Sequence, residues 1–145
     1  MSAGWCIVLL WLAGCGGDRS ANSQPLILRS EVEVVGLPGA VQVDSVAWAP
    51  RSWALTGSGK FEITGSYGLF FRNLSDQPLE IRYDLRFFDR DTFFIDIFIP
   101  FGLPLRLAPH EGRHDGDDFT IRVEEPRALD ELQTMRVRVV VDTAR

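Results

Sequence analysis

The feature that most constrains the fold is a strict alternation of apolar and polar side chains along two segments, residues 60–72 and 79–89. A period of two places the apolar side chains on one face of a β-strand, whereas a helix needs a period near 3.6. The two segments therefore predict half-buried strands, and the polar cluster at 73–78 predicts a turn that closes them into a hairpin. The predicted inward side chains are Phe61, Ile63, Tyr67, Leu69, Phe71, Leu79, Ile81, Tyr83, Leu85 and Phe87.

Similar alternation extends over most of the chain, with turn signals about every ten residues. Residues 126–132 begin with proline and continue with helix formers, so one short helix is expected between the last two strands. The pattern predicts an all-β, antiparallel two-sheet sandwich formed by one domain at 26–145, best defined over 60–142. Further strands are expected at 26–35, 41–48, 92–99, 118–124 and 134–142, with a short edge piece at 103–107.

The start of the chain has a different character. An apolar run at 5–12 is followed by Ala13, Gly14 and Cys15. The run is too short to span a bilayer, which takes about 20 apolar residues, and it fits the apolar core of a secretion signal. The glycines that follow would end any helix of the domain itself at this point.

The order Leu12, Ala13, Gly14, Cys15 resembles the lipobox of bacterial lipoproteins. The resemblance implies a signal peptide at 1–14, cleavage before Cys15, and a diacylglycerol on the Cys15 thiol that anchors the chain to the membrane. Residues 15–25 would form the lipidated end and a flexible tether, since two or more acyl chains hold stably. Gly16, in place of an aspartate, favours the periplasmic face of the outer membrane over the inner membrane, again by resemblance.

Composition restricts the partners of the mature chain. Removal of residues 1–14 would leave 131 residues, a length that suits one domain. The leader holds no charged residue, so the net charge of −5 belongs to the remainder and argues against nucleic-acid binding. Cys6 would leave with the leader and Cys15 would be acylated, so no disulfide, cysteine metal site or cofactor is expected.

One stretch of the predicted sandwich resembles the immunoglobulin-like domains of bacterial envelope lipoproteins, of the FxLyD and YcfL-like types. The likeness covers roughly residues 60–142, and Leu107-Ala108-Pro109 followed by a strand at 119–123 continues its order. It implies a fold rather than an active site, because such domains carry no catalytic residues to transfer. The matching positions are Asn73, Ser75, Pro78, Leu79, Tyr83, Leu85, Phe87, Phe88 and Asp89.

Two motifs match enzyme signatures, in full or in part, in residue type and spacing but lack the structural context that those signatures require. Residues 110–114 read H-E-x-x-H, which makes a zinc protease when a helix sets both histidines on one face. Here Pro109 and Gly112 exclude such a helix and favour a strand-connecting loop, although a cation held by that loop stays open. Residues 57–60 read G-S-G-K without the leading glycine of a phosphate-binding loop, so a turn is expected.

The clearest indication of function in the sequence is a group of apolar side chains on strand faces that are expected to point outward. Phe70, Phe88, Phe94 and Phe98 fall on the nominally outward faces of three strands. Such a patch marks a candidate interaction face unless another part of the chain buries it. The segment 26–53, with Trp48 and Trp53, could supply that cover, and both alternatives stand at this point.

The sequence thus favours a non-catalytic, lipid-anchored envelope module that binds an envelope protein or supports an assembly. The alternative is a binding module for an apolar or lipid-like small ligand. A docking role predicts an exposed phenylalanine patch, and a ligand role predicts a concave pocket under 26–53. An enzyme would need polar groups that converge around His110 or His114.

Overall fold

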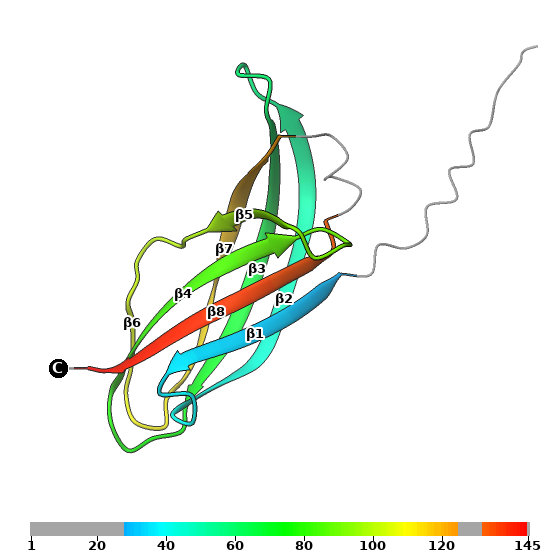
Figure 1. Ribbon diagram of the computed structural model, residues 1–145. Helices are drawn as coiled ribbons and strands as arrows, with labels where there is room; N and C mark the ends of the chain where they lie inside the picture. Colours follow the sequence, from blue (N-terminus) through cyan, green and yellow to red (C-terminus); the bar gives the residue numbers. More distant parts are fainter. Residues whose placement is uncertain (1–27, 125–131, 145) are drawn as a thin grey trace, which may run out of the picture.

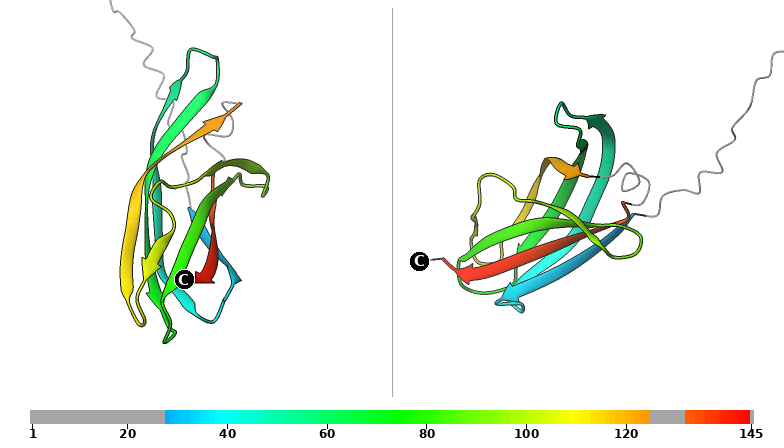
Figure 2. Two further views of the ribbon diagram at one scale, coloured as in Figure 1. Left: turned by 90° about the vertical axis from the view of Figure 1, so that its left-hand side faces the viewer. Right: turned by 45° about the horizontal axis from the view of Figure 1, so that its top comes forward.

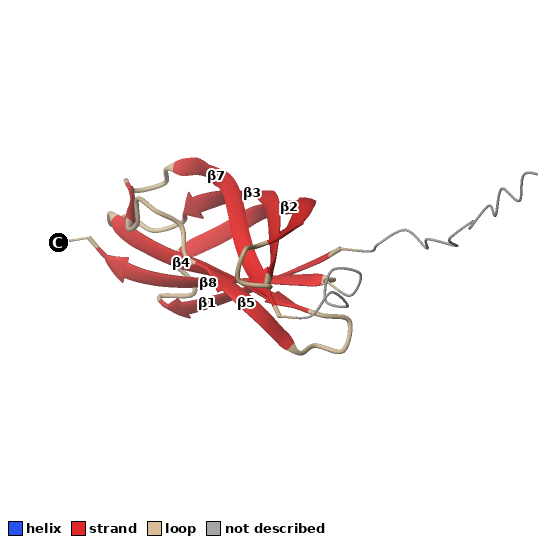
Figure 3. Ribbon diagram, turned by 90° about the horizontal axis from the view of Figure 1, so that it is seen from above, coloured by secondary structure: helices blue, strands red, loops and turns tan. Residues whose placement is uncertain are grey.

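The computed structural model describes residues 28–124 and 132–144, and in this part of the chain all regular structure is β-strand (Figures 1 and 3). The helix predicted at 126–132 falls outside the described residues, apart from Leu132. None of the described segments is a helix of the length and apolarity that crossing a membrane requires. The strands are β1 (Arg29–Gly36), β2 (Val41–Leu55), β3 (Phe61–Asn73), β4 (Leu79–Phe88), β5 (Phe94–Phe98), β6 (Leu105–Leu107), β7 (Gly112–Val123) and β8 (Thr134–Thr143).

The strands form two sheets that face each other across one core (Figure 2). One sheet has the order β1-β8-β4-β5, with β6 paired to the other end of β4, and the second sheet has the order β2-β3-β7. Aromatic rings join the layers: the ring of Phe87 in β4 lies 5.7 Å from that of Trp48 in β2 and 4.7 Å from that of Phe119 in β7. The all-β prediction with two sheets is confirmed.

Period-two burial is clearest in β3 and β4, the two segments that alternate most strictly. Alternate residues from Ile63 to Asn73 and from Leu79 to Phe87 are buried, and those between them are more exposed. Each strand therefore points one apolar face at the shared core, as the sequence predicts.

The predicted hairpin between these strands is wrong. β3 pairs with β2 and β7, whereas β4 pairs with β8, β5 and β6, so the connection at 74–78 crosses between the sheets. Asn73 holds this crossing with a side chain that is 1% exposed. Its amide nitrogen donates to the carbonyls of Gln77 (2.8 Å) and Ala108 (2.9 Å), and its amide oxygen accepts from the Ser75 backbone (2.9 Å).

The prediction of purely antiparallel sheets also fails, because β1 pairs with β8 in parallel. The two strands lie at opposite ends of the domain sequence, so no tight turn imposes an antiparallel direction on them. Gly36 ends β1 with a φ of 92°, and a Cβ there would collide with the carbonyl oxygen of Val141. Glycine therefore lets the end of β1 approach β8 closely.

Two strands run well beyond their predicted limits. β2 continues to Leu55 rather than ending near 48, and β7 begins at Gly112 rather than at 118. Pro50 fits inside β2 because this is an edge strand with a register irregularity between Pro50 and Ser52. The early start of β7 moves His114 from the expected loop onto a strand.

Candidate binding surface

The four phenylalanines predicted to form one interaction face lie in three different places. Phe70 is on β3 in the three-stranded sheet, with its ring 4.5 Å from that of His114. Phe88 and Phe94 are neighbours on β4 and β5, with ring centroids 5.9 Å apart. Phe98 packs against the core, 6.0 Å from the ring of Tyr67. The predicted face is therefore not formed.

Two physical reasons separate these side chains. β3 and β4 belong to opposite layers, so their outward faces point in opposite directions. In β5, the register against β4 shifts between Phe87 and Phe88, and Ile95 has no partner. One extra residue inverts the alternation, so Phe94 and Phe98 fall on opposite faces although they are four residues apart.

The alternative, in which residues 26–53 cover these phenylalanines, is not seen in the described part of that segment, residues 28–53. β1 extends the five-stranded sheet at its edge and β2 extends the three-stranded sheet, so neither crosses a sheet face. Trp48 lies in the core, 9% exposed, and its indole N–H donates to the Arg29 carbonyl (3.1 Å). Trp53 is 59% exposed, and its ring lies 5.6 Å from that of Phe61 on the neighbouring strand.

An exposed apolar segment does exist, at residues 93–101. Phe93 (69% exposed) and Phe94 (58%) stand where the β4–β5 turn enters β5, and we refer to them as the hairpin pair. Ile97 (38%), Ile99 (63%) and Phe101 (99%) follow along β5 and the connection to β6, and we refer to them as the flank residues. Large apolar side chains that stay exposed together mark a contact surface for protein or lipid.

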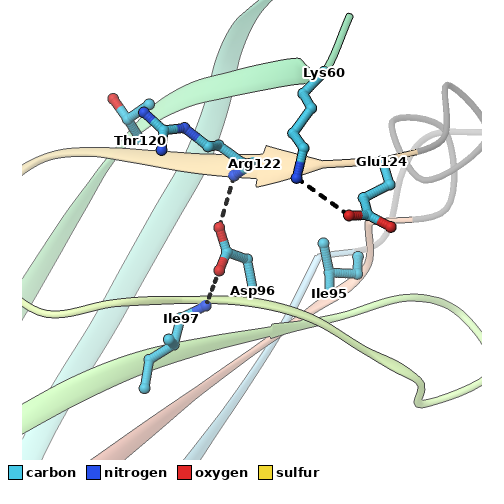
Figure 4. Close-up of a pocket in the computed structure, with 7 residues that line it drawn as sticks. All are labelled: Lys60, Ile95, Asp96, Ile97, Thr120, Arg122 and Glu124. Carbon is cyan, nitrogen blue, oxygen red and sulfur yellow. Dashed lines mark hydrogen bonds and ion pairs between the residues drawn. The ribbon is translucent and has the colours of Figure 1, made fainter. Parts of the chain in front are cut away.

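A polar hollow of about 550 Å³ lies beside this segment, where the edges of β5 and β7 meet (Figure 4). The Asp96 carboxylate bridges the sheets: one oxygen accepts from the Arg122 backbone N–H (2.7 Å) and the other from that of Ile97 (2.8 Å). Lys60 pairs with Glu124 at 3.2 Å. Lys60 and Glu124 thus neutralise each other, and the Asp96 carboxylate satisfies a backbone donor on the outer edge of β7.

A smaller hollow of about 200 Å³ lies against the second half of β2. Its lining includes Pro50, Trp53, Ile63 and Leu132. This hollow lies near segment 26–53, where a small-ligand module is expected to have its pocket. Ligand sites usually measure roughly 300–1,000 Å³, so the hollow would cover only part of a lipid-like molecule.

The H-E-x-x-H residues make separate, local contacts. His110 sits in the turn before β7 with a φ of 61°, and its Nε2 lies 2.9 Å from an Asp76 carboxylate oxygen. The Glu111 carboxylate accepts from the Ala108 backbone N–H of the same turn (2.7 Å), and the His114 ring meets the Phe70 ring in a T-shaped arrangement. Within 28–124 and 132–144, no three histidine, cysteine or acidic side chains gather as a metal site would require. The arrangement does not match a zinc protease, which needs both histidines on one helix face.

Sequence reasoning misses a buried polar network between the sheets. The Tyr83 hydroxyl donates to the Asp115 carboxylate, and the Tyr67 and Tyr83 hydroxyls are 3.2 Å apart. Burial raises the pKa of Tyr83 well above its usual value, and the hydrogen bond to Asp115 raises that pKa further. Burial also raises the pKa of Tyr67. Both tyrosines therefore stay neutral and hold β3, β4 and β7 together rather than exchanging protons.

No family model and no curated protein matches this sequence. Among solved structures, the chain is similar to the X-ray structure of Northeast Structural Genomics Consortium target SoR45, with 12% identity, a TM-score of 0.45, and coverage of 59% of this chain and 66% of that one. It is also similar to the crystal structure of Campylobacter jejuni cj0090, with 16% identity, a TM-score of 0.37, and coverage of 77% and 97%. The fold and surface thus define a class rather than a function: an all-β, two-sheet domain with an exposed apolar segment on one edge.

Proposed function

We propose that this chain is a lipid-anchored module of the cell envelope that binds an envelope protein and performs no catalysis. In this proposal Cys15 carries the lipid, as the likeness of residues 12–15 to a lipobox implies, and the domain stands at the periplasmic face of the outer membrane. The observation that carries the binding role is the exposure of the flank residues, Ile97, Ile99 and Phe101, beside a core that is closed without them.

We further propose that the two-sheet domain is an immunoglobulin-like sandwich of the FxLyD or YcfL-like lipoprotein type. Support comes from the crossing of the chain between sheets at 74–78 and from the core that both sheets share.

Geometry favours a protein partner over a small ligand. Phe101 is 99% exposed, so its ring projects from the surface and cannot line a concave pocket. The apolar hollow at Trp53 is smaller than most ligand sites, and the larger hollow at Asp96 is polar. A projecting aromatic side chain is the kind of anchor that fills a pocket on a partner protein. The small-ligand alternative would use the hollow between Pro50 and Leu132.

Site-specific photocrosslinking in living cells tests the binding role. A photoreactive phenylalanine analogue would replace Phe101 in one strain and Glu33, exposed on β1, in a second strain. We expect a discrete crosslinked protein from position 101, none from position 33, and a weaker product when Ile99→Ser is added. No product from position 101, or the same products from both positions, contradicts the proposal. Copurified lipid that is lost on Trp53→Ala would support the alternative.

A further inference from the structure

The described chain begins next to the β4–β5 turn. The Arg29 backbone N–H at the start of β1 donates to the Gln133 carbonyl (2.8 Å), and the Gln133 N–H donates to the Phe88 carbonyl (3.1 Å). Phe88 is the last residue of β4, so these two bonds place the start of β1 beside the turn that carries the hairpin pair. Figure 1 shows the first residues of β1 and the tip of this hairpin at the same end of the domain.

Exposed apolar side chains gather at this end from two parts of the chain. The hairpin pair, Phe93 and Phe94, contributes one side. Trp53 (59% exposed) and Leu55 (62%) contribute the other, from the last residues of β2. Trp53 lines a hollow together with Leu132, the residue directly before Gln133, so Trp53 adjoins the residues that bond the start of β1. Leu55 is the last residue of β2 and lies two residues further along that strand. We refer to these four residues as the entry-end cluster.

The hairpin tip that presents Phe93 is held in place. One oxygen of the Asp89 carboxylate accepts from the backbone N–H groups of Asp91 (2.9 Å) and Phe93 (2.8 Å). The Asp89 N–H in turn donates to the Phe93 carbonyl (3.0 Å). Phe93 thus stays exposed on a turn with fixed backbone geometry, which lowers the ordering cost of a contact made there.

We propose that the entry-end cluster docks on the lipid surface to which Cys15 is attached, with its aromatic rings at headgroup level. This inference rests on the proposed lipid anchor. Leu28 lies 13 residues after Cys15, so an extended chain between them spans at most about 45 Å. The anchor therefore holds this end of the domain near the bilayer. Tryptophan and other aromatic side chains favour the membrane interface.

The net charge of the chain bears on whether this docking needs anionic lipid. The chain has 20 acidic residues against 15 lysines and arginines, a net charge of −5, and this balance argues against a polybasic hold on anionic lipid. Of the basic groups near the cluster, Arg51 is paired with Asp118 at 2.9 Å and Lys60 with Glu124 at 3.2 Å, and Arg90 in the hairpin turn lies between Asp89 and Asp91 in the sequence. Docking would therefore be apolar, would tolerate salt and would not require anionic headgroups.

Docking would also orient the surface proposed for protein binding. In the register of β4 with its neighbours, Phe94 lies opposite Phe88 at the entry end, Phe98 lies opposite Leu85, and Leu105 lies opposite Ile81. The connection from Phe98 to Leu105, which carries Ile99 and Phe101, therefore leads away from the entry end. A docked domain would hold these flank residues off the membrane, where a periplasmic partner can reach them.

Tryptophan quenching by brominated lipid tests the docking directly. The chain from residue 15 onward keeps every described residue and holds one thiol, at Cys15, which would be coupled to a maleimide lipid in phosphatidylcholine vesicles. This chain has two tryptophans, the buried Trp48 and the exposed Trp53, and the Trp53→Phe variant reports Trp48 alone. The test variant is Phe93→Ser/Phe94→Ser, and the matched control is Ile99→Ser/Phe101→Ser, which removes two apolar side chains of similar exposure from the flank.

We expect brominated lipid to quench Trp53 at least about twice as strongly in the unsubstituted chain as in Phe93→Ser/Phe94→Ser, as for a side chain buried in the headgroup and acyl boundary. The flank control and 0.5 M salt should leave the quenching unchanged. Absence of Trp53 quenching in the unsubstituted chain overturns the proposal, and so does equal quenching in all three proteins. Chemical coupling makes this result independent of acylation in cells, so a failed anchor and a failed docking are separate outcomes.

Discussion

Replacement of Asn73 by alanine probes the crossing between the two sheets. The substitution removes the bonds that the amide donates to the Gln77 and Ala108 carbonyls, a longer one to the Leu107 carbonyl (3.5 Å), and the two that it accepts from the Ser75 backbone N–H and hydroxyl. Asn73 is only 1% exposed. A buried group left without its partner costs about 1–3 kcal/mol. Since the carbonyls near the surface can rehydrate in part, we expect Asn73→Ala to lower the free energy of unfolding by about 2–4 kcal/mol.

Urea unfolding of the chain from residue 15 onward measures this difference. The control is Gln77→Ala, because the Gln77 side chain is exposed and only its carbonyl accepts from Asn73. We expect the control to stay within about 0.5 kcal/mol of the unsubstituted protein, with equal dependence on urea in all three chains. A cost below about 0.5 kcal/mol for Asn73→Ala would refute the view that this amide holds the crossing.

The substitution Asn73→Asp tests the same contacts through the pH dependence of stability. The introduced carboxylate would face the two carbonyl oxygens that now accept from the amide, and burial beside them raises its pKa above the unfolded value near 3.9. A raised folded pKa means that the introduced group is tolerated best below the unfolded pKa and that stability is lost as pH rises. The deficit of this variant, relative to the unsubstituted protein at each pH, should therefore shrink as pH falls from the raised folded pKa toward about 4, and should change little below that pH. A deficit that does not change with pH contradicts the orientation assigned to the amide.

Other substitutions test the packing of the two layers. Because burial raises the pKa of Tyr83, the folded protein should lose stability as pH rises above the unfolded tyrosine value of about 10, and Tyr83→Phe should make that loss shallower while costing about 1–2 kcal/mol at neutral pH. Unchanged alkaline unfolding in that variant would count against the buried network. At Gly65 a Cβ would collide with the Phe119 ring and lie 2.5 Å from the Ala49 carbonyl oxygen, so Gly65→Ala should cost about 3 kcal/mol. Gly57→Ala, where the added Cβ meets no atom within 4 Å, should cost far less in the same thermal melts.

The sequence predicts where strands form better than it predicts how they pair. Alternation in 60–72 and 79–89 identifies β3 and β4 and nearly all of their buried side chains. It says that each strand has one apolar face, but two strands of the same sheet and two strands of facing sheets satisfy that condition equally. The capping role of Asn73, which holds the crossing, depends on the Ala108 carbonyl 35 residues away in the sequence, so local turn chemistry alone favours a hairpin.

The candidate surface is predictable only in part, for a similar reason. The apolar run at 92–99 is visible in the sequence, but the unpaired residue Ile95 decides which side chains of β5 face outward. No residue type in this run predicts an unpaired position. The buried tyrosine network is comparable. Alternation predicts that Tyr67 and Tyr83 face inward, but the contact of Tyr83 with Asp115 requires β7 to begin before residue 115. Gly112 and Gly116 argue against a strand there, because glycine is depleted in strands, so the sequence does not predict this early start.

Acylation of Cys15 is the measurement that tests the central claim most directly. The full chain would be expressed in a Gram-negative host supplied with an alkyne analogue of palmitate, and the tryptic peptide that ends at Arg19 would be read by mass spectrometry. The account predicts a peptide that begins at Cys15 and carries a diacylglycerol, in the membrane fraction, with the label lost in Cys15→Ser. An intact bond between Gly14 and Cys15, or an unmodified Cys15 thiol on a protein outside the membrane fraction, would contradict it.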